Sequence, residues 1–229
     1  MRELVQRRAA SRYNRRVRFS TIFFDLDDTL YPADSGLWPM IKQRMTRYMV
    51  DRMRIPEADV PRLRETYFRR YGTTLRGLQA NHVVDTEDYL AYVHDVRLAD
   101  YIQPDPVQQS VLADLPTRNV VFTNADANHA RRVLRELEIE QHFADIIDVN
   151  RMDPHCKPQP EALRLALGIA GEANPGRCAL IDDLPHTTRA AREMGLFAVL
   201  FGARGQGIDA DAACGDWTAL PAVLNGTVA

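Results

Sequence analysis

The feature that most constrains this chain is the segment Thr21–Leu30, a short apolar run that ends in three carboxylates within four residues. Such a run predicts a buried strand that carries charge at its C-terminal end. In open α/β sheets, ligands bind in the crevice outside the carboxyl ends of the strands. Asp25 and Asp27 are two residues apart, and side chains with this spacing point to the same face of a strand. We therefore expect both carboxylates to reach such a crevice.

These neighbouring carboxylates predict a cation site. Carboxylates this close repel each other and resist joint ionisation unless a cation joins them. Hard oxygen ligands that leave room for a phosphate are typical of Mg²⁺, so we predict Mg²⁺ as the cofactor. The alternative is a strand followed by an acidic turn or a helix N-cap, and we assign Asp28 to that role.

Length and composition limit the classes of protein that this chain can be. Its 229 residues have room for one α/β core with an inserted subdomain, and 45% hydrophobic and 26% charged residues are ordinary for a globular protein. The net charge of −2 gives no overall attraction to a nucleic acid polymer or an anionic membrane, and no apolar run approaches the roughly 18 residues of a spanning helix. Three widely spaced cysteines without a CxxC pair favour a reducing compartment. We predict a cytoplasmic protein that acts on a small molecule, as a monomer or a homodimer.

Residues 1–18 form a basic N-terminal arm with seven arginines and one glutamate. The arm lacks the apolar centre of a secretory signal. A transit peptide, a nucleic-acid contact and a solvated helix before the first strand all fit this composition, and we favour the solvated helix.

Residues 34–102 have a helical pattern. Apolar residues recur three and four apart over 37–49, and similar stretches follow over 57–71 and 86–101. Residues 71–78 contain two glycines, and we predict that they interrupt these helices as a loop. We expect the whole region to be a helical insertion between two strands of the core.

The core is expected to consist of residues 19–33 and 103–229, where strand and helix patterns alternate. Beyond the first strand, apolar strands are predicted at 119–122, 146–149, 179–181 and 196–201. Such alternation predicts an α/β fold, here a Rossmann-like core with a mostly parallel sheet. The tail from Gly202 is predicted as loop, with a short helix near Leu220.

Three further loops place polar residues at strand ends. They contain Thr123, Lys157 and the pair Asp182-Asp183. Lys157 is one of only two lysines among 29 basic residues, so an ammonium stands where the chain otherwise uses arginine. Taken singly, Thr123 also fits a helix N-cap and Lys157 a surface position. Because the carboxyl ends of parallel strands meet at one edge of the sheet, we expect these residues to lie together.

The order of these residues resembles a known superfamily. The pattern Asp-x-Asp-x-Thr that begins at Asp25, followed by Thr123, Lys157 and the Asp182-Asp183 pair, is similar to the four motifs of the haloacid dehalogenase-like superfamily. This resemblance implies a Rossmann-like core with a mobile cap inserted after the first motif. A response-regulator receiver also places an acidic cluster, a threonine and a lysine around Mg²⁺. In a receiver, however, the acidic pair precedes the phosphorylated aspartate, whereas here the pair comes last and a cap is inserted.

The resemblance and the charges together imply a role for each residue. Asp25 is expected to attack phosphorus and form an aspartyl phosphate, while Asp27 protonates the leaving oxygen and then deprotonates water. Thr123, Lys157 and Mg²⁺ are expected to hold the phosphoryl oxygens. The predicted metal ligands are the side chains of Asp25 and Asp183 and the backbone carbonyl of Asp27. Asp182 is expected to bind the metal directly or through water.

Longer segments are similar to one family within the superfamily. Residues 23–32, 71–78, 122–130, 156–158 and 181–183 resemble the pyrimidine 5′-nucleotidases of yeast and their bacterial and plant relatives. The second aspartate of the first motif also favours phosphate-ester hydrolysis, since transport ATPases have threonine there and haloacid dehalogenases lack this acid. We therefore predict a Mg²⁺-dependent phosphatase of pyrimidine nucleoside 5′-monophosphates. The alternatives are a general phosphatase of small sugar phosphates and a non-catalytic phosphoacceptor or binding module.

The cap is expected to determine the substrate, because the core motifs contact only the phosphoryl group. In the core, Asn124 is grouped with the substrate-binding residues. In the cap, Arg76 is the first candidate, since a guanidinium in a glycine-broken loop can donate to base carbonyls or sugar hydroxyls. An arginine in a solvated loop is the alternative. Asn128 and His129, beside the second motif, are further candidates.

Overall fold

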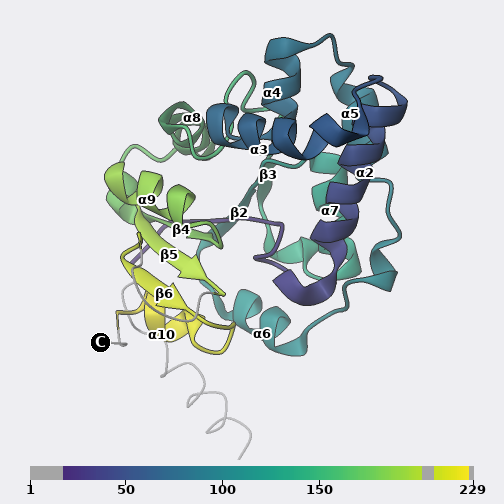
Figure 1. The fold of residues 1–229 in the computed structure, drawn as a ribbon. Coiled ribbons are helices and arrows are strands. Elements are labelled where there is room, and N and C mark those ends of the chain that lie inside the picture. The colour runs from purple at the N-terminus through teal and green to yellow at the C-terminus, as the bar shows by residue number, and fades with distance from the viewer. Residues whose placement is uncertain (1–17, 203–208, 227–229) are drawn as a thin grey trace, which may run out of the picture.

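The computed structural model describes residues 18–202 and 209–226. Within them, six strands form one sheet in the order β3-β2-β1-β4-β5-β6, and every pair of neighbours is parallel (Figure 1). The strands are β1 (Thr21–Phe24), β2 (Arg118–Phe122), β3 (Asp145–Ile147), β4 (Cys178–Asp182), β5 (Phe197–Phe201) and β6 (Ala212–Cys214). The predicted α/β fold with a mostly parallel sheet is confirmed.

Strand β1 lies inside the sheet, between β2 and β4. All four of its residues are buried, as expected for a parallel strand that is covered on both faces. Backbone pairing continues past the strand ends, since the N–H of Asp25 donates to the carbonyl of Ile181 at 2.9 Å. The N–H of Thr123 likewise donates to the carbonyl of Ile147 at 3.0 Å. The sheet therefore fixes Asp25 and Thr123 at its carboxyl edge.

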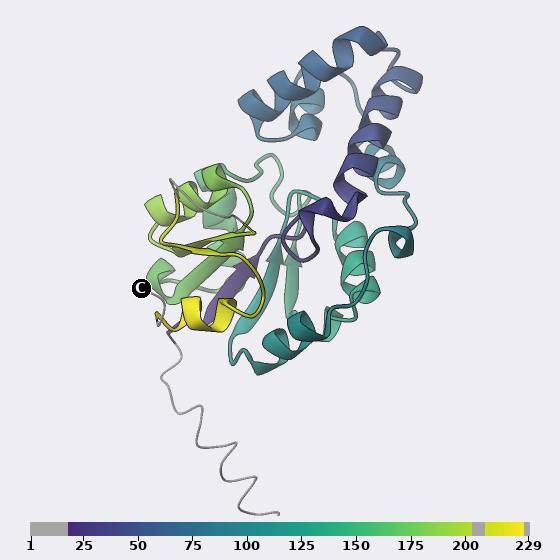
Figure 2. The ribbon, with the colours of Figure 1, turned by 60° about the horizontal axis from the view of Figure 1, so that its bottom comes forward.

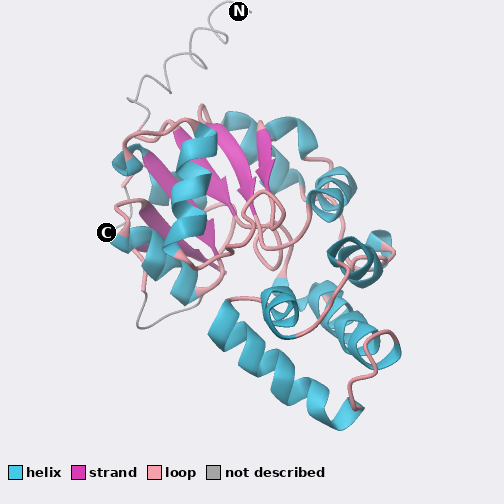
Figure 3. Ribbon diagram, turned by 90° about the horizontal axis from the view of Figure 1, so that it is seen from above, coloured by secondary structure: helices cyan, strands magenta, loops and turns pink. Residues whose placement is uncertain are grey.

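Helices cover both faces of this sheet (Figure 3). The core helices are α6 (Pro106–Asp114), α7 (Ala127–Glu136), α8 (Pro160–Ala170), α9 (Pro185–Glu193) and α10 (Leu220–Leu224). Helices α8 and α9 share a hydrophobic cluster with Phe23 of β1 and Phe122 of β2. Helices α6, α7 and α10 share another with Ile22 and Phe24. Successive residues of β1 thus belong to different clusters, as the two-residue period of a strand requires.

The helices that follow β1 form a separate group, which extends away from the sheet (Figure 2). They are α2 (Leu37–Asp51), α3 (Val60–Tyr71), α4 (Thr74–Asn81) and α5 (Thr86–Val93). All four contribute to a further group of packed side chains that includes Met49, Tyr67 and Leu78, and that also contacts Val149 of the core loop after β3. The start of α2 belongs instead to the core cluster, through Leu37 and Ile41.

The segment 71–78, predicted as a loop, contains most of helix α4. Gly72 ends α3 with a φ of 86°, and the side chain of Thr73 accepts a hydrogen bond of 3.1 Å from the backbone N–H three residues later, which is a usual N-cap contact. Gly77 lies inside α4, where a Cβ atom would come within 2.2 Å of Tyr67. The loop prediction is wrong, because one glycine ends a helix and the other allows α3 and α4 to pack closely.

The C-terminal tail also departs from its prediction. Strand β6 lies in a region expected to be loop and adds a parallel edge strand next to β5. The short helix expected near Leu220 is confirmed as α10. Short 3-10 helices complete the described secondary structure: η1 (Ala33–Ser35), η2 (Glu57–Asp59), η3 (Leu98–Asp100), η4 (Glu140–His142) and η5 (Pro175–Arg177).

The predicted basic arm lies outside the described residues, apart from Arg18. The Arg18 guanidinium lies 4.2 Å from the centre of the Phe197 ring, a cation–π contact with the core. No helix within residues 18–202 and 209–226 combines the length and the apolar character that crossing a membrane would require.

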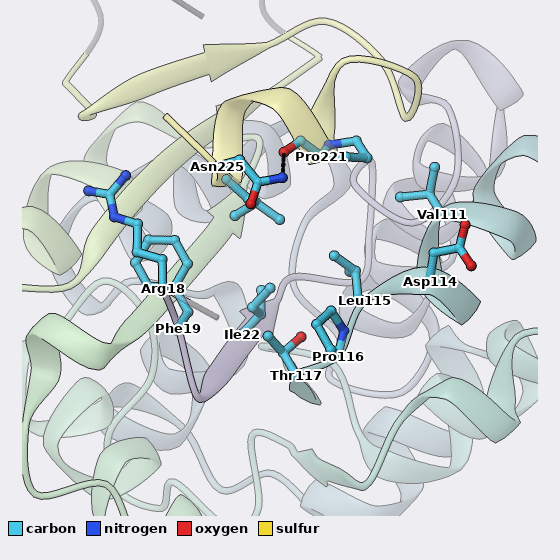
Figure 4. Close-up of a pocket in the computed structure, with 11 residues that line it drawn as sticks. Arg18, Phe19, Ile22, Val111, Asp114, Leu115, Pro116, Thr117, Pro221 and Asn225 are labelled. Carbon is cyan, nitrogen blue, oxygen red and sulfur yellow. Dashed lines mark hydrogen bonds between the residues drawn. The ribbon is translucent and has the colours of Figure 1, made fainter. Parts of the chain in front are cut away.

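A small pocket lies at the amino edge of the sheet, near the starts of β1 and β2 (Figure 4). Its volume of about 60 Å³ leaves room for a few water molecules. Its wall includes Phe19, Leu115 and Asn225, and the Asn225 side chain donates to the carbonyl of Pro221 at 2.7 Å. None of the predicted catalytic or metal-binding residues lines this pocket, because they lie at the opposite, carboxyl edge of the sheet.

Candidate active site

Loops at the carboxyl edge of the sheet bring acidic and basic groups together. Asp25 follows β1 and Asp182 ends β4, and these two strands are neighbours in the sheet. Lys157, from the loop between β3 and α8, places its Nζ 2.5 Å from Oδ1 of Asp25 and 2.7 Å from Oδ2 of Asp182. All three side chains are buried. The structure therefore joins residues that are 25 to 157 positions apart in an ionic cluster.

Burial and charge shift the pKa values within this cluster. Burial raises the pKa of Asp25 well above its ordinary value; Lys157 opposes this rise, and Asp182 and Asp183 add to it. Burial alone would lower the pKa of Lys157, but the attraction of Asp182 and Asp25 outweighs burial and raises it. Lys157 is therefore a stable cation at neutral pH, and the carboxyl groups around it outnumber it.

Three carboxyl groups converge closely enough to share a metal ion. Oxygens of Asp25, Asp182 and Asp183 lie within 4.8 Å of one another. Burial, reinforced by Asp182, raises the pKa of Asp183 to about 7. Asp182 is held in addition by the backbone, since its Oδ1 accepts a hydrogen bond of 2.9 Å from the N–H of Leu184. A group of hard oxygen donors whose charges repel one another fits a Mg²⁺ site.

The side chain of Asp27 has different partners from this cluster. Its Oδ1 accepts a hydrogen bond of 2.7 Å from the Tyr31 hydroxyl and lies 3.3 Å from Nε2 of His129. Burial alone would raise the pKa of Asp27, but the contacts with His129 and Tyr31 outweigh burial and lower it. Both partners use Oδ1, so they fix the carboxylate without using its second oxygen.

Two buried histidines support Asp27 from the side of helix α7. The rings of His94 and His129 stack with centroids 4.1 Å apart and planes 14° apart. Nδ1 of His94 lies 2.6 Å from Oδ2 of Asp126. Asp126 in turn caps α7, since its Oδ1 accepts hydrogen bonds from the backbone N–H groups of Asn128 and His129. The N-terminus of α7 therefore holds His129 against Asp27.

The predicted residues after β2 have two kinds of contact. The Thr123 hydroxyl accepts a hydrogen bond of 3.0 Å from the backbone N–H of Ala125, and its own O–H can still donate to another group. The Asn124 side chain donates to the carbonyl of Lys157 at 3.1 Å and accepts from the N–H of Lys157 at 2.9 Å. Asn124 therefore fastens the loop that carries the lysine.

A cavity of about 540 Å³ opens onto these residues. Sites for small molecules usually occupy roughly 300–1,000 Å³. The floor of the cavity includes Asp25, Asp27, Thr123, Lys157 and Asp183, and its opposite wall comes from helices α2 to α5. The carboxylates, the ammonium and the threonine hydroxyl thus face a space in which a phosphorylated molecule can lie.

A family model for haloacid dehalogenase-like hydrolases matches residues 19–195. This chain belongs to the haloacid dehalogenase-like hydrolase family. Among curated proteins, phosphate metabolism protein 8 of Saccharomyces cerevisiae is 29% identical to this hydrolase over 195 residues, which cover 78% of this chain. The matched region spans 60% of the length of the yeast protein.

Solved structures of similar proteins share the fold of this hydrolase. A haloacid dehalogenase-like hydrolase from Streptococcus pneumoniae has a TM-score of 0.61 and 21% identity, covering 91% of this chain and 99% of its own. A 2-haloacid dehalogenase from Pseudomonas syringae has a TM-score of 0.58 and 19% identity, covering 90% of this chain and 98% of its own. A predicted phosphoglycolate phosphatase from Haemophilus somnus has a TM-score of 0.60 and 17% identity, covering 90% of this chain and 98% of its own. At these identities, the likeness shows the fold alone.

Arg76 does not have the surroundings predicted for it in this hydrolase. It is a buried residue of α4, 7% exposed, and it is absent from the cavity wall. Its Nη2 donates to the carbonyls of Val149 at 2.7 Å and His155 at 2.9 Å, and its Nη1 pairs with Asp153. The expectation of a solvated loop residue or a substrate ligand is therefore not supported. Arg76 instead fastens α4 to the core loop that leads to Lys157.

The candidates beside the second motif also lie outside the cavity wall. Asn128 is exposed on α7, and His129 is fully buried. His129 reaches the site as a neighbour of Asp27 and not as the predicted substrate ligand. Asp28 does lie in a turn, as predicted, with a φ of 59°. Its side chain nevertheless lines the cavity, and burial together with Asp27 raises its pKa to about 6.

Sequence reasoning missed the cap residues that line the cavity. We define the cap wall by its aromatic and cationic side chains: Trp38, Lys42, Arg64, Phe68 and Tyr89. The first two are four residues apart on α2, and the next two are four apart on α3, so each pair shares a helix face. The sequence contains one signal for this wall, because Lys42 is the only lysine besides Lys157. The others are ordinary surface residues by spacing, and only the packing of α2, α3 and α5 brings them to one cavity.

Proposed function

We propose that this hydrolase cleaves phosphate monoesters through an aspartyl phosphate on Asp25. The observation that carries this proposal is the setting of Asp25, which lies on the cavity floor with the Lys157 ammonium at 2.5 Å and further carboxylates nearby. Asp27 is held by Tyr31 and His129, outside the ionic cluster, and its pKa is lowered where that of Asp25 is raised. Two carboxyl groups with such different pKa values can take different roles in acid–base chemistry. The names of the yeast relative and of the Haemophilus phosphoglycolate phosphatase also favour a phosphatase.

We propose Mg²⁺ as the cofactor. Asp25, Asp182 and Asp183 would hold it, together with the backbone carbonyl of Asp27. When bound, the ion would offset the charge of the carboxylates and polarise the phosphoryl group. This requirement follows from electrostatics, since a phosphate dianion is repelled by several carboxylates when Lys157 alone opposes them.

In the first step, an oxygen of Asp25 forms a bond to phosphorus while the bond from phosphorus to the ester oxygen breaks. Asp27 donates a proton to that leaving oxygen. A bound dianion raises the pKa of a neighbouring carboxyl group, so substrate binding favours the protonated form of Asp27 that this step uses. Thr123 and Lys157 are proposed to hold the phosphoryl oxygens as the charge shifts.

In the second step, Asp27 takes a proton from a water molecule. The water oxygen bonds to phosphorus while the bond from phosphorus to Asp25 breaks, and phosphate is released. Asp27 has then regained the proton that it gave to the leaving group, so the pair returns to its starting state. The contact with Tyr31 keeps the Asp27 carboxylate in place through both transfers.

We propose pyrimidine nucleoside 5′-monophosphates as the substrates, with residues 34–102 acting as a cap over them. The cavity is much larger than a phosphate group requires, and its cap wall includes the rings of Trp38, Phe68 and Tyr89. The similarity of several segments to pyrimidine 5′-nucleotidases supports the same substrate class. A general phosphatase of small sugar phosphates is the competing hypothesis.

A turnover screen tests these proposals. Phosphate release would be measured with Mg²⁺ from UMP, CMP, AMP, ribose 5-phosphate, glucose 6-phosphate and phosphoglycolate, with the Asp25→Asn protein as the blank. The highest kcat/KM on UMP or CMP is the expected result. A similar kcat/KM on the sugar phosphates would instead support the general phosphatase. No release above the blank from any compound would overturn the phosphatase proposal itself.

A further inference from the structure

The cap wall contains polar groups that lack partners. Among the described residues, Nε of Arg64 and the hydroxyl of Tyr89 are buried without a hydrogen-bond partner, and both side chains line the cavity. Buried polar groups in proteins are nearly always hydrogen-bonded, so each exception calls for an explanation. A ligand that contacts both side chains from the cavity would give each of these groups a partner.

Arg64 is held in position by its other nitrogen atoms. Its Nη1 donates to the carbonyl of Lys42 and to Oγ1 of Thr46, both at 3.1 Å. Within residues 18–202 and 209–226, no carboxylate forms an ion pair with it. Burial accordingly lowers the pKa of the guanidinium. Two acceptors on α2 therefore fix the Arg64 guanidinium on the cap wall, and its Nε–H group remains unpaired.

Tyr89 presents a single polar atom on an otherwise apolar side chain. The residue is 1% exposed, and its ring packs edge-on against Tyr48 with centroids 5.0 Å apart. Burial raises the pKa of Tyr89, and the charge of Arg64 opposes this rise without cancelling it. The hydroxyl therefore keeps its proton and remains a donor, and both Tyr89 and Arg64 line the cavity.

The cavity lining around these two donors is largely apolar. Trp38 carries the Lys42 ammonium 5.3 Å from its ring centre. Phe68 is 44% exposed, and its ring contacts that of His186 from the core, with centroids 5.6 Å apart. Leu90 and Val93 also line the cavity, so the cap wall suits a broad, thin group better than a small, fully hydroxylated one.

We infer that Arg64 and Tyr89 recognise the carbonyl oxygens of a pyrimidine base, while the aromatic residues of the cap wall cover its faces. This inference rests on the proposed function, because it assigns a site to the leaving group of that reaction. Arg64 donates through N–H groups only, and a neutral Tyr89 can donate through its O–H, so oxygen acceptors are the natural complement of the pair. A second anionic group fits less well, since Asp28 and Glu65 line the same cavity.

The inference can be tested with two substrates that differ only in the base. UMP and ribose 5-phosphate share the phosphate and the sugar, so the ratio of their kcat/KM values measures the contribution of the base. Tyr89→Phe removes only the hydroxyl, and Arg64→Met keeps most of the side-chain length without the donors. Each change should lower kcat/KM for UMP by about tenfold or more and leave kcat/KM for ribose 5-phosphate nearly unchanged.

A matched control is Arg62→Met, on the same helix. Arg62 is exposed and pairs with Asp59, so neither substrate should be affected. Equal losses on UMP and ribose 5-phosphate would overturn the inference, because they would mean that Arg64 and Tyr89 serve cap closure or folding. A wild-type preference for UMP that both variants retain would also overturn it, while leaving the proposed function in place. No preference of the wild-type protein for nucleotides would overturn both proposals together.

Discussion

The Tyr31 hydroxyl donates a hydrogen bond of 2.7 Å to Oδ1 of Asp27. Burial, and then the charge of Asp27, raise the pKa of Tyr31 well above its ordinary value, so the hydroxyl keeps its proton and remains a donor. This contact fixes the carboxylate that we propose as the general acid and base. Its loss should therefore affect substrates whose leaving group needs a proton more than substrates whose leaving group does not.

Tyr31→Phe should lower kcat/KM for UMP by about tenfold or more, because a misplaced acid protonates the ribose oxygen poorly. The loss on p-nitrophenyl phosphate should be much smaller, since nitrophenolate leaves without a proton. Tyr48→Phe is the matched control, because it removes a tyrosine–aspartate hydrogen bond of 2.9 Å to Asp88, within the cap. A loss of the same size on both substrates would mean that Tyr31 supports the fold and does not position the acid.

Asp25→Asn should abolish turnover, because an amide is a poor nucleophile and cannot carry the phosphoryl group. The variant should remain folded, since Lys157 keeps its contact with Asp182 and the cluster loses one of several repelling charges. Thermal unfolding in EDTA checks the fold, and phosphate release from UMP checks activity. Retention of even about a tenth of wild-type activity would rule out Asp25 as the nucleophile.

Mg²⁺ should stabilise the folded protein more strongly as the pH rises. The Asp183 pKa is raised from 3.8 to about 7 without metal, so the contribution of its protonated form to stability is present at low pH and is lost as the pH rises through about 7. Below that pH, the metal must displace a proton in order to bind. The increase in Tm at a fixed Mg²⁺ concentration should therefore grow between about pH 6 and about pH 8. In Asp183→Asn this growth should be much reduced, and an unchanged profile would show that another group controls it.

Arg76→Ala should destabilise the fold by about 2–4 kcal/mol, because it leaves buried carbonyls of the core without their donor. The partners that matter are Val149 and His155, since Asp153 is 62% exposed on its side chain. Asp153→Asn should therefore cost about 1 kcal/mol or less. Urea unfolding measures both changes. If the two variants are equally stable, the backbone contacts of Arg76 contribute little. Any loss of kcat/KM in Arg76→Ala should be similar for UMP and ribose 5-phosphate, in contrast to Arg64→Met.

The elements that the sequence predicts best are those whose signal is local. A short apolar run that ends in polar residues identifies β1, β2 and β4, and parallel topology then requires Asp25, Thr123 and Asp182 to share an edge of the sheet. Strand β6 could not be found in this way, because Ala212–Cys214 has no strand pattern and pairs only because β5 lies beside it. Its place depends on the tertiary structure.

The residues that surround the core motifs were harder to predict, because their roles depend on contacts between distant segments. Arg76 has the sequence context of a loop residue, and its burial depends on acceptors more than 70 positions later. His129 is close to Thr123 in the sequence, but α7 turns it toward Asp27. The cap wall combines residues of three helices, so no single segment of the sequence shows it.

Helices α2 to α5 pack mainly on one another, while the reactive carboxylates lie at the carboxyl edge of the sheet. Substitutions on the inner side of these helices can therefore accumulate without disturbing the residues proposed to break the phosphate ester. Such a division allows descendants of one ancestral enzyme to exchange the compound that they recognise and keep the reaction that they inherited. In the laboratory, it makes the cavity-lining residues of these helices the natural positions to diversify when a new specificity is wanted.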